Sequence, residues 1–402
     1  MSNKIILHID MNSYFASVEQ QANPFLRGKA VGVCSYISPG GCIIASSMEA
    51  KAKGIKTGCR VNEARKLDPN VILVENEPAK YRTVSEKIFK ILGSYSDTVE
   101  PYSIDEGFLD LSGWMGSFER ANCLAREIQT RIKAEVGEWL NCSVGISWTK
   151  FLAKFAGDIA PKKGILTIEN KLKLMEVLRG KNLTDAWGIN KRMEARLNRL
   201  GIKSLIDLKN YNPDRIREAL GRYGYYLWAN VNGVEISKVN EGTPKPKSVG
   251  HSYCLPKKTT DKEYLTSVLY KLCEKTGRRL RADDFEANSL NIGWNYIHEG
   301  GYYKSFKTSE KIFTTEEIFK FANQILEKAQ LLMPVRMLAV SVGALSPVSG
   351  QLSFFQDNLG KKELSRAMDK LNNKYGEYTV IRGKMFGTDD MAKDRIGFRK
   401  VN

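Results

Sequence analysis

Two short apolar segments, far apart in the sequence, each lead into acidic residues. A short buried strand is predicted to end at Asp10, and residues 99–111 have the pattern of two strands around a tight turn that carries Asp105 and Glu106. Neighbouring strands of one sheet can bring such distant acids together. Gly107 favours the local twist that would let both neighbouring acids serve one site. The pattern therefore predicts a sheet that carries a carboxylate cluster.

Strands alternate with helices in the first part of the chain, which predicts an α/β core. Helical periodicity covers residues 13–20, 80–94 and 118–135. From about residue 165 onward the pattern is almost wholly helical. This change predicts a second module, with separate helical pieces at residues 187–209 and 214–230.

A short basic segment, residues 242–247, contains alternating prolines, which favour an extended chain and predict a domain boundary. Beyond it, four strand-like segments and two helical stretches predict an independent α+β module. The strands are expected at residues 247–255, 289–296, 302–308 and 337–345, and the helices at 264–281 and 315–332. A chain of 402 residues is therefore expected to be a multidomain α/β and α+β protein.

The charge balance narrows the class of partner. With 62 Lys and Arg against 45 Asp and Glu, the formal net charge of +17 favours nucleic acid, with a solvated basic surface as the alternative. Three histidines are too few for catalysis by several imidazoles, and the seven cysteines form no Cys-x-x-Cys pair. Metal-carboxylate chemistry is therefore favoured. No apolar run has membrane-spanning length and no secretion signal is evident, so a cytoplasmic protein without membrane partners is expected.

Acids arranged in this way suit phosphoryl transfer assisted by two metal ions. Two divalent ions about 3.5 to 4 Å apart need a carboxylate cluster, and they activate a nucleophile and neutralise charge on a transferring phosphoryl group. Surface carboxylates at strand ends are the alternative for either acidic segment taken alone. The presence of both segments favours the metal site.

Three motifs, in order along the chain, resemble the Y-family translesion DNA polymerases. They are HIDMNSYFASVEQ at residues 8–20, SIDEGFLDL at 103–111 and SVGISWTKFLAKFAGDIAPKKG at 143–164. The resemblance covers nearly the whole chain and is closest to the UmuC subgroup, the catalytic subunit of DNA polymerase V, which is related to DNA polymerase IV. It implies low-fidelity, template-directed DNA synthesis past lesions, from deoxynucleoside triphosphates, in DNA damage repair or the SOS response.

The resemblance also implies a right-hand polymerase with palm, small fingers, helical thumb and little finger, also called the polymerase-associated domain. The implied ranges are 1–10 and 77–165 for the palm, 11–76 for the fingers, 166–241 for the thumb, 247–347 for the little finger and 348–402 for a C-terminal tail.

The family's metal site maps onto the acidic segments. By resemblance, Asp10, the backbone carbonyl of Met11, Asp105 and Glu106 hold two Mg²⁺ ions, and the three acids are the catalytic residues. Asn12 stands where many relatives have a second aspartate, so it is expected not to be a ligand.

Phe15 falls at the family's steric-gate position, where a ring under the sugar excludes a 2′-hydroxyl; a simple core aromatic is the alternative. Tyr14 is assigned to the same nucleotide site, with packing into the palm as its alternative. In the fingers, Met48 replaces a tyrosine and Lys51 an arginine of the commoner family pattern. Lysine can still neutralise a phosphate as a point charge, but it lacks the bidentate fork of arginine.

Two further family positions lie near the triphosphate. Lys162 is assigned to a phosphate contact, although Pro161 shifts the register and leaves Lys163 as an alternative. Tyr81 also resembles a nucleotide-site residue.

Residues 187–209 resemble a helix-hairpin-helix, in which a tight turn aims backbone amides at a DNA phosphate. Gly188, Asn190 and Lys191 are assigned to this DNA contact, and Asn190 is expected to keep the left-handed turn in place of a glycine. In the little finger, Lys247 and Lys257 are expected to follow the DNA backbone.

The segment Gln351-Leu352-Ser353-Phe354-Phe355 fits the peptide by which bacterial polymerases bind the sliding clamp, with Gln351, Leu352, Phe354 and Phe355 as contacts. A UmuD-like accessory dimer and RecA are further partners that the family allows. Two rival functions stay open: a non-catalytic DNA-binding platform, and another palm-fold nucleotidyltransferase such as a cyclase or reverse transcriptase. Neither rival explains all the motifs.

Overall fold

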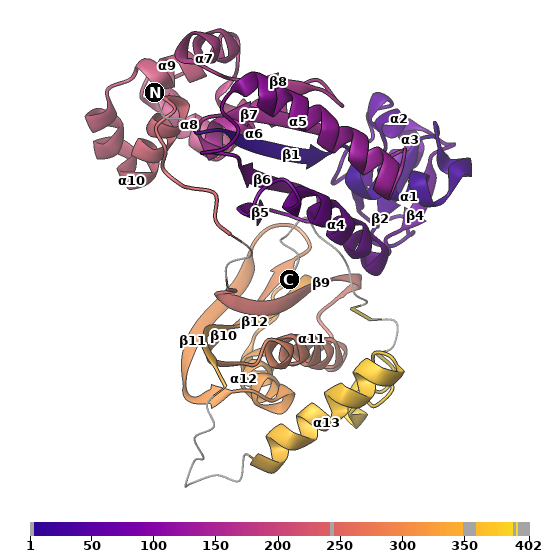
Figure 1. Ribbon diagram of the computed structural model, residues 1–402. Helices are drawn as coiled ribbons and strands as arrows, with labels where there is room; N and C mark the ends of the chain where they lie inside the picture. Colours follow the sequence, from indigo (N-terminus) through magenta and orange to yellow (C-terminus); the bar gives the residue numbers. More distant parts are fainter. Residues whose placement is uncertain (1–3, 242–244, 349–358, 389–390, 393–402) are drawn as a thin grey trace. The chain divides into compact units, whose positions relative to one another are not determined.

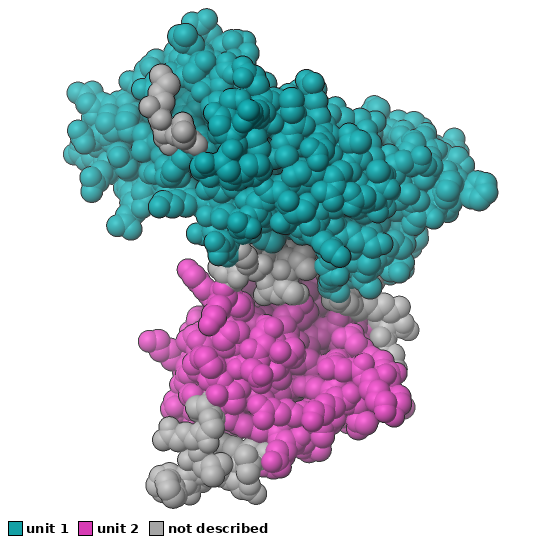
Figure 2. All heavy atoms as spheres, viewed as in Figure 1, with its two compact units in different colours: residues 1–243, 395–402 teal, residues 244–394 magenta. Residues whose placement is uncertain are grey.

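The computed structural model describes residues 4–241, 245–348, 359–388 and 391–392. The described residues divide into two compact units, one ending at residue 241 and one beginning at residue 245 (Figure 2). Each unit has its own apolar core. Within these ranges no helix combines the length and apolar character needed to cross a membrane.

A five-stranded sheet with the strand order β5-β6-β1-β7-β8 forms the centre of the first unit (Figure 1). β1 (Ile6–Met11) lies between β6 (Glu106–Asp110) and β7 (Cys142–Ser147) and is antiparallel to both. β5 (Val99–Pro101) and β8 (Ile165–Thr167) form the edges. The acidic segments that the sequence predicts to meet are therefore on neighbouring strands.

The two faces of this sheet are covered by different helices. Leu7, Ile9 and Met11 share a core with α4 (Pro78–Gly93) and α5 (Phe118–Arg131), which continues as a π-helical turn over Ile132–Val136. Ile6 instead packs with Ala153 of α6 (Lys150–Ile159) on the other face. Since strand side chains alternate, His8 and Asp10 are on the α6 side.

β8 differs from the sequence interpretation, which placed the start of the helical module at about residue 165. It pairs in parallel with β7, with Val144 opposite Ile165. Three residues are too few to show a period-two pattern, and only pairing with β7 makes them a strand.

A smaller sheet of order β3-β2-β4 lies within residues 23–76. β2 (Val31–Cys34) pairs antiparallel with β3 (Ile43–Ser46) and parallel with β4 (Ile72–Glu75). The remaining helical elements here are η1 (Pro24–Leu26), α2 (Met48–Ala52) and α3 (Val61–Leu67). α1 (Tyr14–Ala22) joins this sheet to the large one, because its apolar residues share a core with both.

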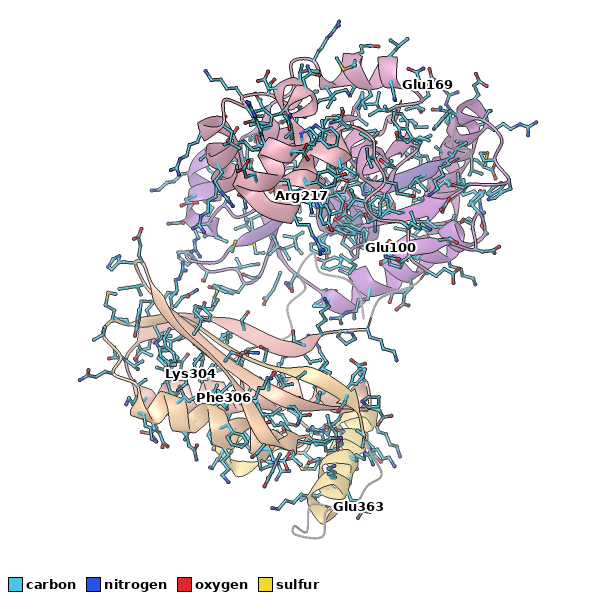
Figure 3. The ribbon with its side chains drawn as sticks, turned by 90° about the vertical axis from the view of Figure 1, so that its left-hand side faces the viewer. Glu100, Glu169, Arg217, Lys304, Phe306 and Glu363 are labelled. Atoms are coloured by element: carbon cyan, nitrogen blue, oxygen red, sulfur yellow. The ribbon has the colours of Figure 1, made fainter. Side chains whose placement is uncertain are left out.

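The rest of the first unit is helical and has a separate core. Its elements are α7 (Lys171–Leu178), η3 (Leu183–Asp185), α8 (Lys191–Arg199), α9 (Leu205–Asn210) and α10 (Pro213–Val231). The segment after α10 returns to the large sheet: Glu100, labelled in Figure 3, accepts hydrogen bonds from Lys150 Nζ at 2.5 Å and from the Asn240 amide at 2.9 Å.

The second unit is an antiparallel sheet of order β11-β10-β12-β9. Its strands are β9 (Ser248–Thr259), β10 (Phe285–Tyr296), β11 (Gly301–Ile312) and β12 (Val335–Pro347). α11 (Lys262–Ala282) and α12 (Thr315–Lys328) share its core. The predicted multidomain α/β and α+β architecture is confirmed.

The described residues after 348 are part of the second unit and do not form a separate extension. A helix, α13 (Leu359–Tyr375), and η4 (Gly383–Met385) belong to the second unit, and Met385 is in its core. The sequence analysis treated residues 348–402 as a tail, as the family resemblance implied, and it did not anticipate α13.

Candidate active site

Asp10 and Glu106 are direct partners across the β1–β6 pair. Residues opposed in this way on antiparallel strands project their side chains from the same face of the sheet. Both side chains therefore emerge on the α6 side, where β1 ends and β6 begins.

Asp105 precedes β6 and is held beside β1 by the backbone. The Met11 amide donates to the Asp105 carbonyl at 2.9 Å, and the Ser103 hydroxyl donates to Asp105 Oδ1 at 2.5 Å. The structure thus brings together Asp10, the Met11 backbone and both predicted acids of the second segment.

Gly107 has a different role from the one expected. It lies inside β6, opposite Ile9, and its φ is not positive. A Cβ atom there would lie 2.7 Å from Phe89 Cε1 of α4. The turn before the acids contains no glycine, so Gly107 provides space for Phe89 and not backbone freedom.

Glu106 is held by two residues that the sequence analysis did not assign to the site. Its Oε2 atom lies 3.0 Å from His8 Nε2 and 2.6 Å from Lys154 Nζ. Burial lowers the pKa of His8, so the ring is neutral. Its Nε2–H group is assigned as the hydrogen-bond donor, because a carboxylate oxygen can only accept. Lys154 also pairs with Asp158 one turn along α6, at 3.3 Å.

Two glycines allow α6 to approach close enough for this contact. A Cβ atom on Gly145 of β7 would lie 2.0 Å from the Ala153 carbonyl oxygen, and one on Gly157 of α6 would lie 2.7 Å from His8 Nδ1. Any larger residue at either position would push the helix away from the sheet. Lys154 reaches Glu106 because the helix backbone lies directly against the strand.

The three acids have very different proton affinities. Burial, followed by repulsion from Asp105 and Glu106, raises the pKa of Asp10 to about 7. Burial also raises the pKa of Asp105 to about 6. Burial acts in the same direction on Glu106, but hydrogen bonding to His8 and the charge of Lys154 outweigh it and hold its pKa at about 2. Two of the three acids therefore lack a compensating cation.

Stability in the absence of metal is expected to fall as pH rises from about 4 to 7. In that window folded Asp10 binds a proton that the unfolded chain, with the ordinary pKa of 3.8, has released, so unfolding becomes easier as pH rises. The contribution is at most about 4 kcal/mol, at about 1.4 kcal/mol per pKa unit. Urea unfolding with a chelator at pH 5 and pH 8 measures it.

The matched variant is Asp10→Asn, which removes this titration and should be more stable than the wild type at pH 8. Asp105, whose pKa is raised to about 6, adds a smaller fall in the same window that this variant keeps, whereas Glu106 does not contribute, because its pKa lies below its ordinary value. An Asp10→Asn variant with the same loss of stability between pH 5 and pH 8 as the wild type would contradict the assignment.

The donor set fits hard divalent cations such as Mg²⁺, which prefer carboxylate and carbonyl oxygens. The excess of buried negative charge at Asp10 and Asp105 is what a cation would neutralise. Among the described residues, however, no three acidic, imidazole or thiol side chains are already arranged as a metal ligand set. Glu106 would have to turn from His8 and Lys154 to join the other two acids.

The aromatic residues assigned to the nucleotide are buried together. Phe15 is 0% exposed and stacks on Tyr81 with ring centroids 4.6 Å apart. The Tyr81 hydroxyl donates to Glu19 at 2.6 Å, and the Tyr14 hydroxyl donates to the Tyr81 carbonyl at 2.7 Å. Tyr14 and Tyr81 therefore serve as packing residues in this conformation, and a nucleotide contact for any of the three stays a prediction.

Lys51 and Lys162 face a common space near the start of α1. Lys51 Nζ donates to Ser13 Oγ at 2.8 Å, and Ser13 Oγ also lies 3.6 Å from Met48 Sδ. Burial and the charge of Lys162 lower the pKa of Lys51, so the two ammonium groups repel each other. A polyanion between them would relieve this repulsion.

Lys163 is fixed by its backbone. Its φ of 65° is in the left-handed region, its amide donates to Asn12 Oδ1 at 2.9 Å, and its carbonyl accepts from Gln129 at 3.2 Å. Lys162 and Lys163 are both among the residues that line a pocket of about 240 Å³, together with Asn12 and Met48. Asn12 thus organises the loop after α6.

Two family models match this chain. The impB/mucB/samB family matches residues 9–158, and the impB/mucB/samB family C-terminal domain matches residues 246–354. DNA polymerase IV of Bacillus velezensis is 33% identical over 99% of this chain and 97% of its own length. DNA polymerase IV 1 of Bacillus subtilis strain 168 is also 33% identical, over the same shares. The chain belongs to the Y-family of DNA polymerases.

Solved structures agree with this family. A Y-family polymerase chimera of Dbh and Dpo4 superimposes with a TM-score of 0.77 at 25% identity, covering 86% of this chain and all of the other. A ternary complex of Dbh gives a TM-score of 0.58 at 25% identity with the same coverage. As a Y-family member this chain is a DNA-directed DNA polymerase that carries out low-fidelity synthesis past lesions. The predicted family is thereby confirmed.

The helix-hairpin-helix expected in this Y-family polymerase has its left-handed residue at Gly188, with φ 94°. Asn190 is not left-handed as expected: its φ is −90°, and it begins α8 as a cap whose side chain accepts from the Met193 amide at 2.9 Å. The turn keeps its geometry because Gly188 supplies the positive φ and Asn190 the cap. Lys191 is exposed in the first turn of α8.

The remaining predicted contacts belong to residues of the second unit. Lys247 precedes β9 and Lys257 lies on it, and both are exposed at this edge strand. The clamp peptide Gln351–Phe355 lies outside the described residues.

His8 and Lys154 are the functional residues that the sequence analysis missed. His8 lies two residues before Asp10 on β1, so the two side chains point to the same face of the sheet. This spacing could have identified His8 from the sequence. The contact between Lys154 and Glu106 could not be anticipated, because it depends on how closely α6 packs on β7.

Proposed function

We propose that this polymerase joins a deoxynucleoside triphosphate to a primer 3′-hydroxyl by two-metal-ion chemistry at Asp10, Met11, Asp105 and Glu106. The observation that carries the proposal is the β1–β6 register, which places Asp10 opposite Glu106 and the Met11 amide on the Asp105 carbonyl. Two Mg²⁺ ions, when bound, would activate the hydroxyl and neutralise charge on the α-phosphate as pyrophosphate leaves.

The residues of the chain have separate tasks in this proposal. Asp10 and Asp105 provide the uncompensated negative charge that attracts cations. His8 and Lys154 hold Glu106 ionised until it turns toward the other acids, so that no proton has to be lost from it. Lys51 and Lys162 attract the triphosphate from the side of the small sheet.

Phe15 is proposed as the steric gate through its place at the start of α1, next to the acids. Its ring is braced by stacking on Tyr81. A braced ring cannot move aside for a 2′-hydroxyl, which is what discrimination against ribonucleotides requires.

The DNA contacts are proposed from exposed basic residues and a capped helix start. Gly188, Asn190 and Lys191 would position a phosphate at α8, and Lys247 and Lys257 would follow the backbone along β9. Primer-template DNA is therefore the macromolecular substrate. A sliding clamp bound through Gln351–Phe355, a cytoplasmic location and action in the SOS response complete the proposal.

The subgroup and accessory partners rest on the sequence alone. Met48 and Lys51 favour the UmuC subgroup, and a UmuD-like dimer and RecA would follow from it. The relatives reported above carry the name DNA polymerase IV, and neither name refers to those partners.

The experiment that tests the function is primer extension with Mg²⁺ on DNA and RNA templates, with and without an abasic site. We expect extension on DNA past the abasic site and little on RNA. Binding of DNA without extension, in the presence of a sliding clamp, would instead support the non-catalytic platform. Preference for RNA templates would support a reverse transcriptase.

Lys162 is expected to contact the triphosphate and Lys163 is not. Lys162 is close enough to Lys51 to lower its pKa, whereas Lys163 is held by its backbone contacts to Asn12 and Gln129. Lys162→Ala should raise KM for the nucleotide about tenfold, the loss of one charged contact worth about 1.4 kcal/mol. Steady-state single-nucleotide insertion measures this.

Lys163→Ala is the matched control and should leave KM within about twofold. Alanine keeps the backbone amide at position 163, which donates to Asn12. A larger effect on KM from Lys163→Ala than from Lys162→Ala would reverse the assignment.

A further inference from the structure

α13 carries an apolar stripe, which we define as Leu364, Met368, Leu371 and Tyr375; three of these residues are exposed and Met368 is half-buried. The spacing of these residues places them on one side of a helix with 3.6 residues per turn. Leu364, Leu371 and Tyr375 are 53%, 44% and 62% exposed. A helix that belongs to a compact unit ordinarily turns such a stripe toward the core.

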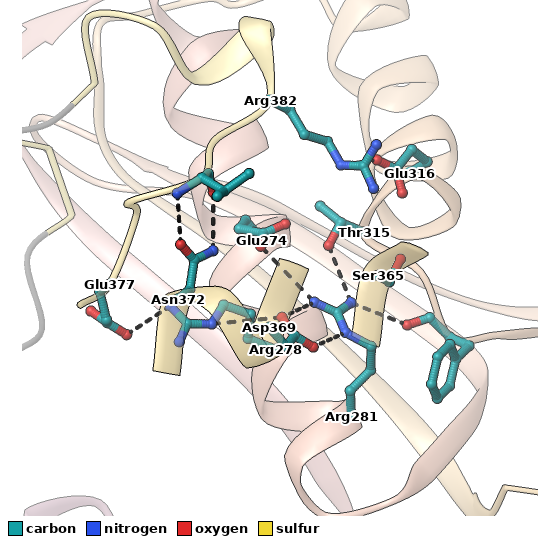
Figure 4. Close-up of polar contacts among 12 residues, drawn as sticks. Glu274, Arg278, Arg281, Thr315, Glu316, Ser365, Asp369, Asn372, Glu377 and Arg382 are labelled. Atoms are coloured by element: carbon teal, nitrogen blue, oxygen red, sulfur yellow. Dashed lines mark hydrogen bonds and ion pairs between the residues drawn. The ribbon is translucent and has the colours of Figure 1, made fainter. Parts of the chain in front are cut away.

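Polar contacts attach α13 to the second unit from a different side. Asp369 forms a bidentate salt bridge with Arg281 of α11, at 2.6 Å to Nε and 3.0 Å to Nη2 (Figure 4). The Arg281 side chain is 3% exposed and also contacts Thr315 at 3.3 Å. Lys362 pairs with Glu286 at 2.5 Å. These contacts determine which side of the helix faces the unit.

A second group of hydrogen bonds lies on the same, inward side of α13. Asn372 is 2% exposed and exchanges hydrogen bonds with the backbone of Val380, at 2.8 and 3.0 Å. Arg278 contacts Asn373 at 2.9 Å (Figure 4 shows the surrounding contacts). No described side chain of α13 belongs to the apolar core, which the chain reaches only through later residues such as Tyr378 and Met385.

The stripe therefore cannot turn inward in this fold. Rolling α13 to bury Leu364 and Leu371 would remove Asp369 from Arg281 and leave a buried guanidinium without its main carboxylate partner, which is strongly unfavourable. The apolar residues are thus held outward by the polar side of the helix. An apolar surface held exposed in this way is a feature of binding sites.

The charges beside the stripe indicate the kind of partner. The exposed ionisable residues of α13 that lie three positions from a stripe residue are Lys361 and Lys374, and Glu363, labelled in Figure 3, only precedes Leu364 in sequence. This surface is net positive, so pairing with the same surface of a second copy would bring like charges together. An acidic surface with a matching apolar strip would complement it.

We propose that the α13 stripe is a docking site for an amphipathic helix of another protein, one whose apolar side is flanked by Asp or Glu. Leu364, Leu371 and Tyr375 would pack between the side chains of the incoming helix, as two helices do when their ridges fit into each other's grooves. Lys361 and Lys374 would pair with its acids. The site adds a protein contact to the polymerase and is independent of the metal and nucleotide residues.

The test uses two synthetic helical peptides of about 20 residues with the same leucine pattern, one flanked by Glu and one by Lys. Fluorescence anisotropy with the full chain should show the acidic peptide binding with a dissociation constant on the order of micromolar and the basic peptide not binding. Leu364→Ser with Leu371→Ser should weaken the acidic peptide at least tenfold. Raising the salt concentration should weaken it as well.

Leu332→Ser is the matched control, since Leu332 is a 76% exposed leucine of the same unit that lies between α12 and β12 and is not part of α13. It should leave binding unchanged. Equal binding of both peptides, or equal binding of the acidic peptide to the stripe variant, overturns the proposal. So does self-association of the wild-type chain in sedimentation that the stripe variant abolishes.

Discussion

Replacing Asp105 and Glu106 together with alanine is expected to lower primer extension by at least about 10⁴-fold on undamaged and abasic templates, or about 5.5 kcal/mol of transition-state stabilisation. The reason is the register of β1 and β6, which gathers these acids with Asp10 at one point. Without them no carboxylate pair remains to hold two cations. Primer extension at saturating Mg²⁺ measures the loss, and DNA binding by anisotropy should be retained.

The control for this variant lies on the same strand. Asp110, at the far end of β6, accepts from the Ser112 amide at 2.9 Å and takes no part in the site. Asp110→Asn should extend primers at the wild-type rate. Since alanine at position 106 leaves Lys154 without its main partner, the isosteric pair Asp105→Asn and Glu106→Gln is needed as well. Wild-type activity in either double variant would remove the metal assignment.

Phe15→Leu is expected to raise ribonucleotide insertion relative to deoxynucleotide insertion by about 10²-fold, the limit for discrimination of a hydroxyl by an apolar surface. Leucine keeps most of the buried volume, whereas alanine would cost about 3 to 5 kcal/mol of folding stability in a fully buried position. The measurement is the ratio of kcat/KM for the two nucleotides, together with the melting temperature.

The melting temperature separates the gate from a simple core aromatic. If Phe15 only packs against Tyr81, Phe15→Leu will lower the melting temperature and leave the nucleotide ratio unchanged. Phe155→Leu provides the comparison, because Phe155 is another fully buried phenylalanine, in the core shared with the helical module. It should lower stability without changing the ratio.

Local sequence patterns predicted the elements that carry the acids. The short apolar run before Asp10 and the two strand-like stretches around a turn at residues 99–111 predicted strands at those places, because such runs are visible within a few residues. The same reasoning anticipated β9 to β12 with their two helices, since each is long enough to show its period. Short elements escaped it, as the three-residue strand β8 shows.

Contacts that depend on how elements pack were not visible in the sequence. Lys154 reaches Glu106 only because Gly145 and Gly157 let α6 lie against β7. Gly107 was interpreted as a turn residue, and only its distance to Phe89 shows that it provides space. Asn190 proved to be a helix cap, because Gly188 already supplies the left-handed backbone.

The sequence by itself determined the chemistry available to this polymerase: the acids, the aromatic residue beside them, the basic charge and the modules. These are properties of residue type and short-range spacing. The tertiary structure decided which groups act on one another, namely that a hydrogen bond from His8 and the charge of Lys154 hold Glu106 ionised, and that α13 turns its polar side inward. Both outcomes depend on buried charge, whose energy is set by partners distant in sequence and by the absence of water around them.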